Sequence, residues 1–79
     1  MNIEDLIKEF EKELINHGFI DNEGLSQDVK DEIRDRINNH HSKCKNIEVS
    51  FYENLEGEII NVSLECEDCY EVIIDSDLI

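Results

Sequence analysis

The feature that most constrains this chain is the placement of its three cysteines, which fall in two clusters. The run His40-His41-Ser42-Lys43-Cys44 has the spacing H-x3-C, and Cys66-Glu67-Asp68-Cys69 has the spacing C-x2-C. Three thiolates and one imidazole form a tetrahedral ligand set that suits zinc. A fold that brings the clusters together would tie the middle of the chain to its C-terminal part.

One histidine of the first cluster fits such a site better than the other. If this segment is helical, His40 and Cys44 lie about 40° apart and one turn along the axis, whereas His41 falls on the flank of that face. We therefore predict a zinc site with the ligands His40, Cys44, Cys66 and Cys69. Four protein ligands leave no position for water, so the metal would be structural and not catalytic.

Two other interpretations of the cysteines stay open, because only one C-x2-C is present. In the first, Cys44 and Cys66 are small buried hydrophobic side chains and Cys69 is an exposed thiol. In the second, Cys66 and Cys69 form a disulfide, although the βαβ context of a thioredoxin-like redox site is absent.

The first part of the chain has the periodicity of two amphipathic helices. Over residues 3–17, the apolar residues recur at helical spacing at Ile3, Leu6, Ile7, Phe10, Leu14 and Ile15. Asn2 is a suitable N-cap, and His17-Gly18-Phe19 predicts a Schellman-like end. A second helix is predicted over residues 26–43, with Ser26 as its N-cap and an apolar stripe at Val29, Ile33 and Ile37. The short turn between them favours an antiparallel helix hairpin.

From residue 46 the period of the apolar residues changes to two. The alternation predicts three strands, with the apolar sets Ile47, Val49 and Phe51, then Ile60, Val62 and Leu64, then Tyr70, Val72 and Ile74. Residues 54–57 and 66–69 are the expected turns. We predict one α+β domain over residues 1–79, in which two N-terminal helices form a hairpin packed on a three-stranded antiparallel β-meander at residues 46–75.

The charge is distributed unevenly along the chain. The formal net charge is −14; residues 1–45 carry eleven acids and all seven bases, whereas residues 46–79 carry ten acids and no base. A purely anionic surface repels nucleic acid and anionic membranes and is attracted to basic grooves. No apolar run approaches the roughly 18 residues of a membrane span, and the acidic start is unlike a signal peptide, so we expect a soluble, cytoplasmic protein.

No residue set in the sequence indicates a reaction. The serines lie in no nucleophile context, and no glycine-rich phosphate loop or calcium-binding loop is present, so we do not expect an enzyme. The acids instead suggest an inhibitor that presents carboxylates where a nuclease or another nucleic-acid-binding protein expects phosphates. The candidate contacts are the ten acids of the sheet region: Glu48, Glu53, Glu56, Glu58, Glu65, Glu67, Asp68, Glu71, Asp75 and Asp77.

The opening residues Met1-Asn2-Ile3-Glu4-Asp5-Leu6-Ile7-Lys8-Glu9 are similar to the start of a Cas9-inhibiting anti-CRISPR family. The small size, the acidity and the share of Asn, Ile and Lys in the composition also resemble those of small proteins of bacteriophages and mobile elements. The resemblance covers residues 1–9 and does not extend to the cysteines. It implies inhibition of a CRISPR effector in the host cytoplasm, by acidic side chains that occupy the DNA-binding groove.

Two alternative functions remain open. The chain can be a zinc-stabilised module that binds another protein and whose acidity is incidental. It can also be an immunity or antitoxin protein that neutralises a basic nuclease toxin. Salt dependence separates the first alternative from phosphate mimicry, because contacts between exposed charges weaken steeply as salt rises and apolar contacts do not.

Overall fold

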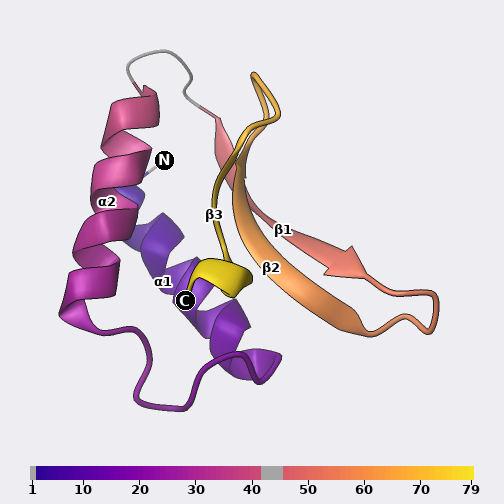
Figure 1. The fold of residues 1–79 in the computed structure, drawn as a ribbon. Helices are drawn as coiled ribbons and strands as arrows, with labels where there is room; N and C mark the ends of the chain where they lie inside the picture. Colours follow the sequence, from indigo (N-terminus) through magenta and orange to yellow (C-terminus); the bar gives the residue numbers. More distant parts are fainter. Residues whose placement is uncertain (1, 42–45) are drawn as a thin grey trace.

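The computed structural model describes residues 2–41 and 46–79 (Figure 1). The elements in chain order are α1 (Ile3–Asn16), α2 (Gln27–His41), β1 (Ile47–Glu53), β2 (Ile59–Cys66), β3 (Val72–Asp75) and the 3-10 helix η1 (Ser76–Leu78). Two helices and one three-stranded antiparallel sheet confirm the predicted α+β class. The predicted ligand Cys44 and the side chain of His41 lie outside the described residues.

Local capping determines both ends of α1. The side chain of the N-cap residue Asn2 accepts a hydrogen bond from the backbone N–H of Glu4 at 2.8 Å. Gly18 has a φ of +78°, and the Phe19 N–H donates to the Leu14 carbonyl at 2.9 Å. The helix therefore ends one residue before the predicted limit.

The second helix begins directly after its predicted cap. The Val29 N–H donates to Ser26 Oγ at 3.3 Å, and α2 extends to His41. The predicted continuation to residue 43 lies outside the described residues. Within the described ranges, neither helix is long and apolar enough to span a membrane.

The sheet has the strand order β1-β2-β3, as in a meander. Ile47 of β1 pairs with Cys66 of β2, and the register continues to Phe51 opposite Val62. The connection between β1 and β2 is the predicted turn, in which the Gly57 N–H donates to the Asn54 carbonyl at 3.1 Å. The hairpin end formed by β1 and β2 extends away from the helices (Figure 1).

The third strand departs from the predicted alternation because of a β-bulge. Leu64 lies opposite Ile74 but the next residue, Glu65, lies opposite Val72, which leaves Ile73 as an extra residue. Ile73 and Ile74 are consequently both buried, whereas Val72 is 47% exposed. Tyr70 is also exposed and belongs to the turn before β3, not to a core-facing set.

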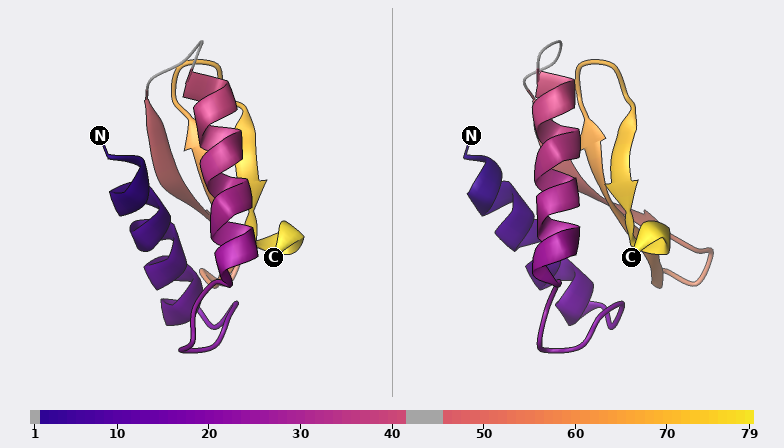
Figure 2. Two further views of the ribbon diagram at one scale, coloured as in Figure 1. Left: turned by 90° about the vertical axis from the view of Figure 1, so that its left-hand side faces the viewer. Right: turned by 60° about the vertical axis from the view of Figure 1, so that its left-hand side comes forward.

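Both helices and all three strands contribute to one buried cluster. The helices lie on the same side of the sheet (Figure 2). The members of the cluster are Leu6, Ile7, Phe10, Leu14, Leu25, Ile33, Ile37, Ile47, Val62, Leu64, Ile73 and Ile74. This core holds the C-terminal end of α2 beside the turn between β2 and β3, where the candidate metal ligands lie.

Candidate metal centre and acidic surface

Three of the four predicted metal ligands meet in space. His40 comes from the last turn of α2, Cys66 ends β2, and Cys69 lies in the turn before β3. One ligand atom from each lies within 4.8 Å of the other two, and His40 Nε2 is 3.3 Å from Cys69 Sγ. Zinc bonds of about 2.0–2.3 Å in a tetrahedron separate ligand atoms by roughly 3.5–3.8 Å, so small side-chain movements would complete the geometry.

The turn that carries the two cysteines is held by its own backbone. The Tyr70 N–H donates to the Cys66 carbonyl at 2.9 Å, and the Cys66 N–H donates to the Glu71 carbonyl at 2.9 Å. Tyr70 has a φ of +63° and is the one non-glycine residue of the described chain in the left-handed region. A left-handed backbone costs a side-chain-bearing residue about 1–2 kcal/mol. Tyr70 is exposed, so no packing contact of its side chain explains this conformation, and the same turn carries the two thiols that lie beside His40.

The surroundings of Cys66 favour its thiolate. Burial raises the pKa of this thiol, but hydrogen bonds from the Cys69 backbone, the His40 side chain, the Asp68 backbone and the Cys69 side chain outweigh that effect and lower the pKa to about 7. The Asp68 N–H lies 3.3 Å from Cys66 Sγ. Because the thiolate is the form that binds metal, protons compete only weakly with a metal ion near neutral pH.

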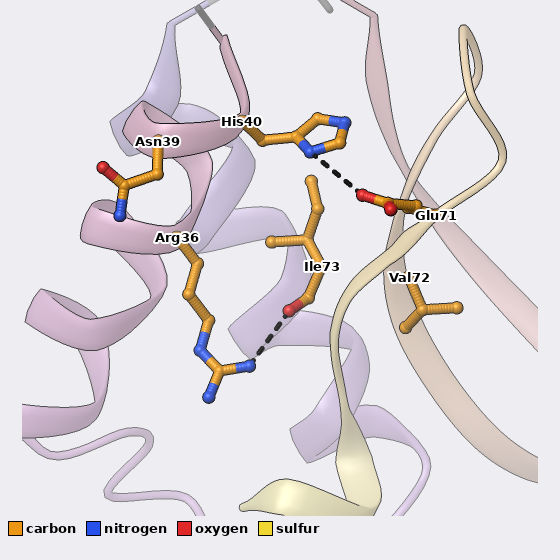
Figure 3. A pocket seen from close by; sticks show the side chains of 6 residues that line it. All are labelled: Arg36, Asn39, His40, Glu71, Val72 and Ile73. Atoms are coloured by element: carbon orange, nitrogen blue, oxygen red, sulfur yellow. Dashed lines mark hydrogen bonds and ion pairs between the residues drawn. The ribbon is translucent and has the colours of Figure 1, made fainter. Parts of the chain in front are cut away.

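The two ring nitrogens of His40 face different groups. Nε2 faces Cys69, whereas Nδ1 lies 3.6 Å from Glu71 Oε2 (Figure 3). The His40 side chain is 15% exposed and that of Glu71 is 73% exposed. The ring is thus held at the edge of the core, and the carboxylate approaches it from solvent.

A pocket of about 290 Å³ lies beside the metal cluster and shares His40 with it. Figure 3 shows the lining residues, which are Arg36, Asn39, His40, Glu71, Val72 and Ile73. Arg36 Nη1 donates to the Ile73 carbonyl at 3.2 Å, and its guanidinium also bonds Glu32. The one guanidinium of the pocket is therefore already used within the protein.

Several of the ten acids predicted to bind a partner already have partners within the protein. Tyr52 Oη and Ser63 Oγ both donate to the carboxylate of Glu65. The hydrogen bond with Glu67, burial and the negative charges of Glu67 and Glu65 raise the pKa of Glu48. Asp68 accepts hydrogen bonds from Asn46, Asp75 accepts one from the Asp77 N–H, and Glu71 lies beside His40. The acids with partners inside the protein are therefore Glu48, Glu65, Glu67, Asp68, Glu71 and Asp75.

The remaining acids lie mainly at the end of the β1–β2 hairpin. Among the described residues, the carboxylates of Glu53, Glu56, Glu58 and Asp77 have neither a hydrogen bond nor an ion pair. Leu55, between the first two, is fully exposed. The hairpin end therefore combines uncompensated negative charge with an accessible apolar side chain.

Three cations of the second helix, Lys30, Arg34 and Arg36, are paired with nearby acids. Arg34 binds Glu4 at 2.6 Å and Asp31 at 2.7 Å, and Lys30 lies 3.4 Å from Glu11. The hydrogen bond from Arg34 also lowers the pKa of Glu4. These cations are paired on the helices and do not compensate the hairpin acids.

Two residues of the metal region have positions that the sequence did not indicate. Glu71 was predicted as a partner-binding acid, yet it lies against a candidate ligand; its place two residues after the C-x2-C is the only sequence signal. Tyr70 was predicted within a strand, and nothing about a tyrosine indicates a left-handed turn.

The chain matches no protein-family model, curated protein or solved structure.

Proposed function

We propose that this protein is a small acidic inhibitor that binds in a basic nucleic-acid-binding groove of another protein, such as a nuclease, by phosphate mimicry. A CRISPR effector is the target implied by the resemblance of residues 1–9. The observation that carries the proposal is the set of carboxylates at Glu53, Glu56 and Glu58, which lie on a protruding hairpin without a cationic partner among the described residues. Lysine and arginine side chains that hold phosphates would pair with them instead.

The hairpin provides a suitable shape for such a groove. It extends beyond the helices, so its end can enter a concave site while the helices stay outside (Figure 1). Leu55 at the turn can contact an apolar part of the groove floor. Charge would then speed association, and the apolar contact would slow dissociation.

Neutralising the hairpin acids should weaken binding to a basic partner. We expect the triple variant Glu53→Gln, Glu56→Gln, Glu58→Gln to bind a purified Cas9–guide RNA complex about 3- to 150-fold more weakly, because exposed ion pairs contribute about 0.2–1 kcal/mol each. The measurement is the dissociation constant at low and at moderate salt, with and without competing target DNA.

The matched control removes the same charge from the helices. The variant Glu9→Gln, Asp28→Asn, Asp35→Asn changes three exposed acids and should bind nearly as the unchanged protein does. Equal weakening in both variants would show that only total charge matters. Binding that ignores both salt and DNA would contradict phosphate mimicry.

The exposed apolar side chains favour a second candidate function. Leu55 and Tyr70 are both largely or fully exposed, as expected for a module that docks on another protein by apolar contacts. Binding that resists salt but is lost in Leu55→Ala would support this module. An immunity or antitoxin protein would use the same charge-based mechanism as the phosphate mimic. A basic nuclease toxin as the binding partner would identify this alternative.

We also propose that His40, Cys66 and Cys69, with Cys44 as the predicted fourth ligand, hold a structural zinc ion. The support is the convergence of the three described ligand atoms and the lowered pKa of Cys66. A reducing compartment such as the cytoplasm would keep these thiols available. Metal analysis of protein purified with zinc in the medium should find one equivalent, and Cys66→Ser/Cys69→Ser should contain none. Protein without metal would leave the cysteines as a buried and an exposed thiol.

A further inference from the structure

The geometry around His40 specifies both of its ring nitrogens. Nε2 lies 3.3 Å from Cys69 Sγ. Nδ1 lies on the side of Glu71, 3.6 Å from its carboxylate (Figure 3). A neutral imidazole has one nitrogen that carries a proton and one that can bind a metal. The group beside Nδ1 therefore decides which nitrogen is free.

Glu71 is placed by the same turn that carries the thiols. Its carbonyl accepts the N–H of Cys66 at 2.9 Å, so the backbone of Glu71 is paired with a candidate ligand. Its side chain remains 73% exposed and can rotate to shorten the distance to Nδ1. Glu71 is not among the residues whose ligand atoms converge, so it is a neighbour of the cluster and not a member.

We infer that Glu71 is a positioning residue for the metal centre, which accepts a hydrogen bond from His40 Nδ1–H and so keeps Nε2 unprotonated and aimed at the metal. This inference rests on the proposed zinc site. Histidine ligands commonly donate their second N–H to a carboxylate, and loss of that partner weakens metal binding about 10- to 100-fold. The exposed acid thus has a role in metal affinity rather than in partner binding.

A competition titration of zinc against a chelating indicator at fixed pH tests the inference. Glu71→Ala should weaken zinc binding about 10- to 100-fold, and Glu71→Gln, which keeps an acceptor oxygen but loses the charge, should recover part of that loss. The matched control Glu67→Ala removes an acid from the same turn, whose carboxylate bonds Glu48 and not His40. It should change the affinity only slightly.

Cobalt substitution distinguishes a positioning residue from a ligand. The absorption spectrum of the cobalt-loaded protein should be the same for Glu71→Ala as for the unchanged chain, because the ligand set is the same. A changed spectrum, an unchanged zinc affinity in Glu71→Ala, or equal losses in Glu71→Ala and Glu67→Ala would each overturn the inference and leave the zinc site standing. Failure of the unchanged protein to bind zinc would instead overturn the proposed site itself.

Discussion

Adding zinc to the metal-free protein is expected to raise its free energy of unfolding by about 4 kcal/mol when free zinc is about 1,000 times the dissociation constant. The physical reason is that the ligands converge only in the folded chain, since His40 lies in the last turn of α2, Cys66 ends β2 and Cys69 lies in the turn before β3. In a domain of this length, such a gain corresponds to a rise of roughly 15–30 °C in Tm.

The variant Cys66→Ser/Cys69→Ser should lose this zinc-dependent rise in Tm. Cys66 is buried, so the substitution also changes packing, and the melting temperatures with excess chelator measure that part separately. Differential scanning calorimetry with zinc and with chelator gives both quantities for each protein. The same rise in the variant, or no rise in the unchanged chain, would contradict the zinc site.

Truncation of Phe10 is expected to be the most damaging change in the core. Its side chain is 0% exposed and lies in the cluster shared by both helices and the sheet. Phe10→Ala should lower the free energy of unfolding by about 3–5 kcal/mol, because the lost burial adds to the cost of the cavity. A domain of this size has a total stability of about 4–12 kcal/mol, so the metal-free variant should lie close to unfolding.

Urea denaturation measures this effect, and Phe51→Ala is the matched control. Phe51 is 43% exposed on the hairpin, and its main aromatic contact is an edge-to-face one with His17. Its truncation should cost about 1–2 kcal/mol, from partial burial and the aromatic pair. If both variants lost the same free energy of unfolding, Phe10 would contribute no more to the core than the half-exposed Phe51, and the prediction would be wrong.

The zinc and core predictions can be combined in one experiment. Zinc should restore about the same free energy to Phe10→Ala as to the unchanged chain, because none of the described metal ligands belongs to the buried cluster that contains Phe10. Unfolding midpoints of both proteins with and without zinc check this additivity. A much smaller rise in the variant would show that the core determines the geometry of the metal site.

The sequence by itself determined the local elements of this protein. Helical periodicity, the cap at Asn2 and the glycine at Gly18 predicted α1 to within one residue of its end, because capping involves only neighbouring residues. The period of two predicted the sheet, and the spacing of His40, Cys66 and Cys69 predicted which side chains converge. Each of these signals depends on a short stretch of chain or on a residue type with specific chemistry.

The tertiary structure alone decided the pairing-dependent features. The bulge opposite Leu64 and Glu65 buries Ile73, because register is a property of two strands and not of one. The ten acids looked equivalent in the sequence, yet Glu65 of β2 accepts a hydrogen bond from the Tyr52 side chain of β1. The same long-range geometry brings Glu71 to His40, since hydrogen bonding between side chains from separate elements depends on how those elements pack.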